Sequence, residues 1–254
     1  MIPQADVTEW RQVAPWSSDA QVEQDLILSR VIVALYSDST LARAIGFRGG
    51  TALHKLFLTP ATRYSEDIDL VQVAPGPVGL LLYAIRRVCD PLLGEPRRQL
   101  TENNAVLVYR FMSSGAPTVP LRLKIEINTR EHVAYAGHQF QRFDVHSRWF
   151  DGEAEVLTFT LPELLATKLR AMYQRRKGRD LYDLWLGLTR GKKQGRAEHG
   201  GKRRLRRGLV GACADQQQGA IDDRVDAERG ERVGGGKNLL LFPQSNGTGA
   251  PVYY

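Results

Sequence analysis

The chain has 254 residues, a formal net charge of +7 and two cysteines, a length that allows one large domain or two small ones. Cys89 and Cys213 are too few and too far apart for a disulfide framework or a zinc site. No apolar run reaches the length of a membrane span, and the N-terminus lacks the pattern of a signal peptide, so we expect a cytoplasmic protein that binds no membrane.

The first predicted element is an amphipathic helix over residues 19–36. Ser18 and Gln21 form the pattern of a capping box just before it. Six apolar residues then follow at helical spacing: Val22, Leu26, Ile27, Val31, Ala34 and Leu35. This spacing predicts a helix that buries one face.

A phosphate-binding pattern follows a short buried strand predicted over residues 44–48. Gly49 and Gly50 let the backbone present N–H groups to a ligand without an intervening Cβ. The helix predicted next offers free N–H donors and a positive dipole end to an anion. Thr51 adds a hydroxyl donor, and Lys55, one turn on, adds a full charge. A turn that uses glycine only for its geometry is the alternative, and this segment alone does not decide between the two.

Two aspartates share one face of the next predicted strand, residues 67–73. Side chains alternate across a strand, so Asp67 and Asp69 project together, and two like charges this close stay ionised most readily around a cation. Divalent ions such as Mg²⁺ bind carboxylate oxygens together with substrate phosphates. Taken alone, the pair also fits an edge strand facing solvent. Ser65 is a further candidate phosphate ligand, although a serine at a strand entry is commoner.

A helix is predicted over residues 78–93, and paired strands are predicted over 104–112 and 120–129. Apolar residues alternate along the second of these strands, which leaves Glu126 on its other face. If this strand lies beside the aspartate strand, Glu126 supplies the third carboxylate of a two-metal site. Taken alone, the alternation favours a strand with a solvated outer face.

A short strand at 156–159 and a helical segment end the predicted fold. The pattern of Thr160–Glu163 is that of a second capping box. Lys168 lies at the edge of an apolar stripe, and Asp180 and Asp183 lie one turn apart on the following helix. Together they can hold a triphosphate, but spacing alone favours an ordinary helical hairpin with surface ion pairs.

The composition changes after residue 189. Residues 190–254 hold 13 of the 35 Lys and Arg, seven of the 28 Asp and Glu, and 13 of the 24 glycines. Residues 1–189 are therefore almost neutral, with 22 basic and 21 acidic residues. Because the tail lacks apolar spacing, we expect it to be disordered or the product of a shifted reading frame. A basic RNA-binding arm is the functional alternative.

These segments resemble the AbiEii/AbiGii-type nucleotidyltransferase toxins, a branch of the DNA polymerase β-like nucleotidyltransferase superfamily. The resemblance covers most of residues 20–190 and rests on four motifs in the family's order: 47–55, 63–70, 124–128, and Lys168-Leu169 with 179–184. It implies an α+β fold. Residues 1–155 form a nucleotidyltransferase-like small mixed sheet with packed helices, and residues 156–189 form a helical part that completes the site. A basic tail in place of further C-terminal helices departs from the family's pattern.

The resemblance also implies roles for individual residues. The catalytic candidates are Asp67, Asp69, Glu126, Lys168, Asp180 and Asp183. The metal-binding candidates are Asp67, Asp69 and Glu126. The nucleotide-binding candidates are Gly50 and Thr51 from the resemblance, together with Gly49, Lys55 and Ser65 from the residue patterns above.

The activity implied is that of a nucleotidyltransferase dependent on Mg²⁺ or Mn²⁺, the toxin of a toxin–antitoxin or phage-defence pair. Its partners would be a nucleoside triphosphate (GTP and CTP are candidates), a tRNA or other RNA acceptor, and a cognate antitoxin protein. Two alternatives stay open: a catalytically inert nucleotide-binding toxin remnant, and a transferase that modifies a small molecule.

Overall fold

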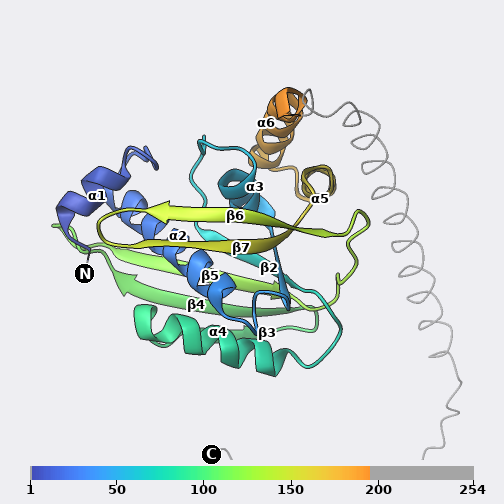
Figure 1. The fold of residues 1–254 in the computed structure, drawn as a ribbon, viewed down its shortest axis with the longest axis horizontal. Helices are drawn as coiled ribbons and strands as arrows, with labels where there is room; N and C mark the ends of the chain where they lie inside the picture. The colour runs from blue at the N-terminus through green and yellow to red at the C-terminus, as the bar shows by residue number, and fades with distance from the viewer. Residues whose placement is uncertain (1, 195–254) are drawn as a thin grey trace, which may run out of the picture. The chain divides into compact units, whose positions relative to one another are not determined.

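A mixed sheet of seven strands lies at the centre of the computed structural model, which describes residues 2–194 (Figure 1). The strand order is β3-β4-β5-β2-β1-β7-β6, so β3 and β6 are the edges. The strands are β1 (Ile45–Arg48), β2 (Asp67–Gln72), β3 (Arg97–Leu100), β4 (Asn104–Met112), β5 (Pro120–Asn128), β6 (His138–His146) and β7 (Asp151–Phe159). Of the two neighbours of β2, β1 runs antiparallel to it and β5 runs parallel.

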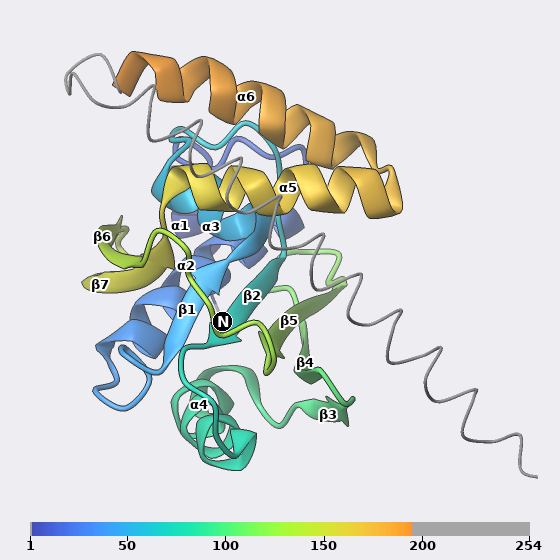
Figure 2. The ribbon, with the colours of Figure 1, turned by 90° about the vertical axis from the view of Figure 1, so that its right-hand side faces the viewer.

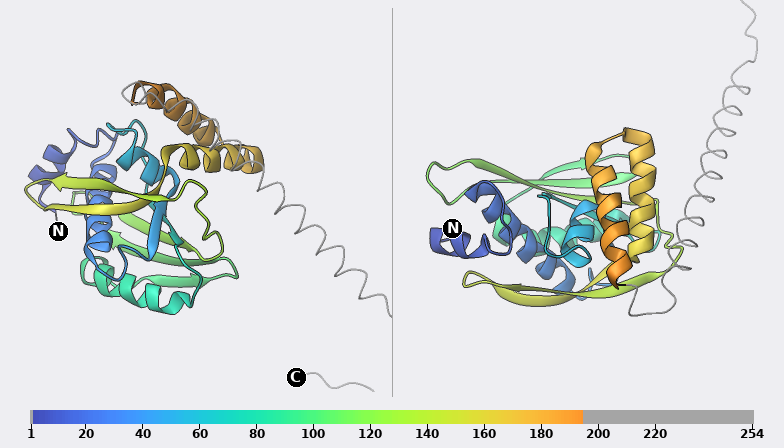
Figure 3. Two further views of the ribbon diagram at one scale, coloured as in Figure 1. Left: turned by 45° about the vertical axis from the view of Figure 1, so that its right-hand side comes forward. Right: turned by 90° about the horizontal axis from the view of Figure 1, so that it is seen from above.

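Six helices pack around this sheet in the described part of the chain. They are α1 (Gln4–Trp10), α2 (Asp19–Ser37), α3 (Gly49–Leu56), α4 (Val78–Leu93), α5 (Leu161–Arg175) and α6 (Gly178–Gln194). Figures 2 and 3 show α5 and α6 lying side by side near α3, with α4 at the other end of the molecule. Between residues 2 and 194, no helix is both long and apolar enough to cross a bilayer.

The two faces of β2 belong to different apolar clusters. Ile68 and Leu70 pack into the larger core, which also contains the buried side chains of α2 and α4. Val71 packs instead into a smaller core with Leu53 of α3 and Leu165 of α5. Since side chains alternate along a strand, Asp67 and Asp69 share the face of Val71. The carboxylates therefore point to the side where α3 and α5 lie.

The predicted α+β class is confirmed, and so are the long helices α2 and α4 and the strand pair β4–β5. The sequence did not predict α1, β3 or β6, and β7 begins at Asp151, ahead of the predicted start at 156. All four residues of β3 are exposed, so this edge strand has no buried apolar alternation to reveal it. Helix α6 continues to Gln194, and the rest of the predicted tail lies outside the described residues.

One of the two predicted capping boxes is wrong. The Ser18 hydroxyl accepts the N–H of Gln21 at 3.3 Å, as expected. At the start of α5 the Thr160 side chain makes no cap bond, and its Oγ1 is buried without a partner. The Glu163 carboxylate instead accepts the backbone N–H groups of Tyr135 and Ala136, at 2.8 and 3.3 Å. The loop before β6 therefore competes successfully for the carboxylate that the capping box requires.

Candidate functional site

Three carboxylates lie on adjacent parallel strands at the middle of the sheet. Asp69 of β2 pairs in register with Glu126 of β5, and Asp67 pairs with Lys124. Residues in register on neighbouring strands share a face, so the two aspartates and Glu126 are on the same side. The condition on which the prediction for Glu126 depended, that its strand lies beside the aspartate strand, is met.

A lysine lies among these carboxylates. The Nζ of Lys124 is 2.9 Å from Oε2 of Glu126 and 3.7 Å from Oδ2 of Asp67. Burial lowers the pKa of Lys124, but the hydrogen bond to Glu126 and the neighbouring aspartates raise it more. Among residues 2–194, no three His, Cys, Asp or Glu side chains are spaced as a ready metal cage. The lysine thus neutralises part of the acidic charge in this arrangement.

The carboxylates nevertheless have the chemistry of a divalent-metal site. Oδ1 of Asp67 is buried and has no hydrogen-bond partner, which is costly unless a cation or donor satisfies it. Burial raises the pKa of Asp69, and the charge of Asp67 raises it further. A bound cation would remove both penalties, since hard ions such as Mg²⁺ take oxygen ligands of this kind. The residues present therefore fit the metal that the family resemblance implies.

The glycine turn before α3 fits closely around the site. Gly49 has a φ of +80°, a conformation that favours glycine, and a Cβ at this position would overlap Oδ2 of Asp69. A Cβ on Gly50 would overlap Nη2 of Arg63 and lie 3.5 Å from Nζ of Lys168. The first turn of α3 therefore touches the carboxylate group on one side and two cations on the other.

The two cations are held by buried aspartates of α6. Asp183 accepts two hydrogen bonds from Arg63, at 2.6 and 2.7 Å, and lies 3.0 Å from Nζ of Lys168. Nε2 of His54 is 2.9 Å from the same carboxylate. Asp180 accepts two bonds from Arg175, at 2.9 and 3.0 Å, and lies 3.4 Å from Lys168. Spacing alone favoured surface ion pairs here; that interpretation is wrong, because both aspartates are fully buried.

The charges around Asp180 and Asp183 keep both carboxylates ionised. Burial would raise the pKa of Asp183, but the hydrogen bonds from Arg63 and His54 and the charge of Lys168 lower it far below its ordinary value. Burial acts on Asp180 in the same way, and its pKa is lowered by Arg175 and Lys168. Cations surround both carboxylates. Asp183 positions Arg63 and Lys168, and Asp180 positions Lys168.

Three of the predicted nucleotide ligands are engaged elsewhere. The Thr51 hydroxyl donates to the backbone carbonyl of Asp67 and lies 2.7 Å from the Ser65 hydroxyl, so both side chains tie α3 to the start of β2. The Lys55 ammonium bonds Asp25 at 2.6 Å and the Ser29 hydroxyl at 3.0 Å. The structure therefore does not bring the Lys55 ammonium to the N-terminus of α3, where the sequence predicts that a phosphate binds. The hydroxyl proton of Thr51 is already donated to the Asp67 carbonyl.

Sequence reasoning missed several residues of the site. Arg63 stands in the motif that carries the aspartates, yet only the fold shows that its guanidinium reaches α6. Arg48 bonds Glu131 at 2.6 Å, and Arg170 bonds the same carboxylate at 2.8 Å, which links β1 to α5 beside the carboxylates. These partners are 39 and 83 residues apart in sequence, so no local pattern predicts them.

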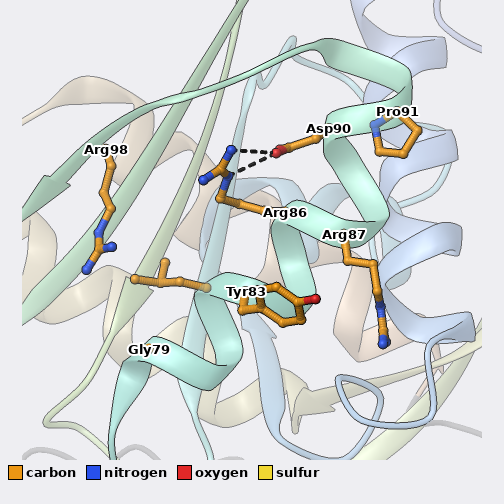
Figure 4. A pocket seen from close by; sticks show the side chains of 8 residues that line it. Gly79, Tyr83, Arg86, Arg87, Asp90, Pro91 and Arg98 are labelled. Atoms are coloured by element: carbon orange, nitrogen blue, oxygen red, sulfur yellow. Dashed lines mark hydrogen bonds and ion pairs between the residues drawn. The ribbon is translucent and has the colours of Figure 1, made fainter.

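A separate cavity of about 480 Å³ lies between α4 and β3, away from the carboxylates (Figure 4). Tyr83, Arg86, Arg87 and Arg98 are among its lining residues. Two of its arginines are already paired, because Arg86 binds Asp90 and Arg87 binds Asp38. The carboxylates of β2 and β5 are therefore the candidate functional site.

The fold is similar to solved structures. It superposes on the MenT4 nucleotidyltransferase toxin of Mycobacterium tuberculosis H37Rv with a TM-score of 0.51 and 19% identity, covering 72% of this chain and 63% of that one. JHP933 from Helicobacter pylori matches with a TM-score of 0.46 and 21% identity, over 66% of this chain and 65% of its own. The chain thus covers less than two thirds of either protein. A comparison with curated proteins finds no match.

A comparison with models of protein families shows the family of this chain. The matching model describes the nucleotidyl transferase AbiEii toxin of type IV toxin–antitoxin systems, and it covers residues 30–232. The matched range reaches well into the segment 190–254 that the composition set apart. The resemblance inferred from the motifs is confirmed, and the chain belongs to the AbiEii nucleotidyltransferase toxin family.

Proposed function

We propose that this chain transfers a nucleoside monophosphate from a nucleoside triphosphate to an RNA hydroxyl, most simply on tRNA, with Mg²⁺ or Mn²⁺ at Asp67, Asp69 and Glu126. The observation that carries the proposal is the register of β2 and β5, which puts Glu126 directly beside Asp69. The orphaned Oδ1 of Asp67 and the close approach of Gly49 to Asp69 support it.

The residues around α3 have the chemistry of a triphosphate site. Gly50 lies at the helix N-terminus, where backbone N–H groups and the dipole favour an anion. Lys168 and Arg63 reach Gly50 and would neutralise the charge of the phosphates. Asp180 and Asp183 hold these cations in place. The cations therefore need little reorganisation when a triphosphate binds.

The reaction is an in-line displacement at the α-phosphorus. The acceptor hydroxyl forms a new P–O bond to the α-phosphorus while the bond from this phosphorus to the β-phosphate oxygen breaks. Pyrophosphate leaves, and the hydroxyl proton passes to solvent. Divalent ions, when bound, stabilise the charge on the attacking and leaving oxygens. Asp67, Asp69 and Glu126 would hold these ions, while α3 and Lys168 would bind the pyrophosphate portion.

The wider role follows from the family. A toxin of a type IV toxin–antitoxin system has an antitoxin as its genetic partner, and we propose that this chain acts in the cytoplasm in such a pair. GTP and CTP are the proposed donors, and phage defence is a proposed setting. The sheet of residues 1–155 would carry the carboxylates, and the helices of 156–189 would complete the site with Lys168, Asp180 and Asp183.

Incubation with each α-labelled nucleoside triphosphate, Mg²⁺ and total tRNA tests the proposal. We expect label to become covalently attached to RNA, with release of an equal amount of pyrophosphate. A small-molecule transferase would instead label hydroxylated small compounds and leave the RNA unlabelled. Nucleotide-dependent stabilisation with no pyrophosphate release would identify a catalytically inert nucleotide-binding remnant and overturn the proposal.

A further inference from the structure

Residues 2–194 leave the face of β3, β4 and β5 that carries the carboxylate site largely uncovered. Leu107, Tyr109 and Ile125 point from these strands into the main core, on the side where α2 and α4 pack. The alternate residues on the opposite face include exposed Arg97, Arg110, Met112 and Arg122. Figure 2 shows no described helix over this side of the three strands.

This face is strongly positive for a sheet surface. Three arginines project from it: Arg97 on β3, Arg110 on β4 and Arg122 on β5. Lys124 and Glu126 of β5 share this face and pair with each other. The register places Arg110 directly opposite Arg122. Like charges at directly opposed positions destabilise a sheet, so a bound anion would stabilise this pairing.

The protein supplies little of that negative charge itself. Glu66 lies 3.6 Å from Arg122, and both side chains are about half exposed, at 44% and 51%. Such an exposed pair contributes at most about 1 kcal/mol. Within residues 2–194, neither Arg97 nor Arg110 forms an ion pair with a protein carboxylate.

The positive face leads straight to the carboxylates. Arg97 pairs in register with Val108, Val108 with Lys124, and Lys124 with Asp67. This row crosses three strand spacings, roughly 14 Å in all, from the edge of the sheet to the metal-site aspartate. A chain of phosphates lying across the row would have its end at the site.

We propose that this face binds the sugar-phosphate backbone of a single-stranded RNA segment and delivers a terminal hydroxyl of that segment to Asp67, Asp69 and Glu126. The inference rests on the proposed function, because it assigns the acceptor of the same site. The face holds arginines and aliphatic side chains such as Val106, Val108 and Met112, and no aromatic residue stacks from β3, β4 or β5 on this side. Recognition is therefore by charge, with little preference for base sequence.

The test is the binding of a fluorescein-labelled single-stranded RNA of about 12 nucleotides, followed by anisotropy over a range of salt concentrations. The variant is Arg110→Gln/Arg122→Gln in the full chain. The matched control, Arg87→Gln/Arg142→Gln, loses the same charge from α4 and β6 at side chains that are 55% and 66% exposed. The control also removes one arginine of the α4–β3 cavity, so it tests that rival surface.

We expect the face variant to raise the RNA Kd about tenfold and to reduce the slope of log K against log salt by about 1.4, the value for two lost single-strand phosphate contacts. The control should change the Kd less than about twofold. Equal weakening in both variants, or an unchanged Kd in the face variant, would overturn the proposal. If the double variant unfolds, Arg97→Gln is measured in the same way, and an unchanged Kd there also overturns it.

Two further readouts separate this proposal from the function on which it rests. RNA binding needs no turnover, so loss of binding in the face variant supports the surface even if wild type transfers no label. Where wild type is active, we expect the face variant to raise the KM for RNA and leave the KM for the nucleoside triphosphate unchanged. An unchanged KM for RNA would reject the surface and leave the enzyme assignment intact.

Discussion

The ammonium of Lys168 lies 3.0 Å from Asp183, in an ion pair that joins α5 to α6 and is 8% exposed on the lysine side and fully buried on the aspartate side. The same ammonium is 3.5 Å from the place where a Cβ of Gly50 would stand. Asp183 therefore holds Lys168 against the N-terminus of α3. This arrangement explains how a buried lysine can lie beside the proposed phosphate site.

Lys168→Met should lower the transfer rate with a small effect on stability. Asp183 keeps its two bonds from Arg63, and Asp180 keeps both bonds from Arg175, so neither carboxylate becomes an unpaired buried charge. Loss of one charged contact to the transition state typically lowers kcat about 10²–10³-fold. Single-turnover kinetics and thermal unfolding measure the two effects. A variant that unfolds but keeps its rate at low temperature would contradict the assignment.

Lys55→Met should have the opposite effect. Its ammonium binds the buried Asp25, which also accepts the indole N–H groups of Trp10 and Trp16 at 3.0 and 3.1 Å. Removing one partner of a buried pair costs about 3–5 kcal/mol, so we expect a clear fall in the unfolding temperature. The KM for the nucleoside triphosphate should stay within about twofold of wild type, since a lost charge contact would change it more. A large rise in this KM without loss of stability would restore the phosphate role that the sequence suggested.

The contrast between these two lysines shows what the sequence can and cannot predict. Helical spacing and alternation were sufficient to place α2, α4, β4 and β5, because each has a regular apolar face. The same alternation put Asp67, Asp69 and Glu126 on their correct faces. It could not predict that Lys55 turns toward Asp25, because the two residues are 30 positions apart and meet only through packing. The sequence patterns made both lysines candidates for contact with phosphate, Lys55 as a nucleotide-binding residue and Lys168 as a catalytic one.

Gly49→Ala should disable the site beyond the cost of backbone strain. Gly94 is a matched control, since its φ of +78° is almost the same and a Cβ there would meet nothing within 4 Å. We expect Gly94→Ala to cost about 1–3 kcal/mol of stability and to leave transfer unchanged. Gly49→Ala introduces a side chain at a similar φ and also displaces the Asp69 carboxylate. Equal activity in the two variants would show that the contact between Gly49 and Asp69 does not matter.

Asp183→Asn should destabilise the chain at neutral pH and much less in acid. Because the pKa of Asp183 is lowered in the folded state, its contribution is present above the ordinary aspartate pKa of about 3.9 and is lost as the pH falls through the folded value. Removing one charge from this buried network costs about 3–5 kcal/mol. Urea unfolding of wild type and variant from neutral pH downward should show a constant difference that shrinks below about pH 4. A difference that grows in acid would contradict the assigned ionisation.

The most direct measurement is metal-dependent label transfer in Asp67→Asn/Asp69→Asn beside Asp144→Asn/Asp151→Asn. The second variant removes the same charge from β6 and β7, where the two aspartates are 48% and 75% exposed. We expect Asp67→Asn/Asp69→Asn to bind a nucleoside triphosphate but to lose at least about 10²-fold in transfer rate, while the control retains the wild-type rate. Transfer at the wild-type rate by Asp67→Asn/Asp69→Asn would contradict the proposed metal site.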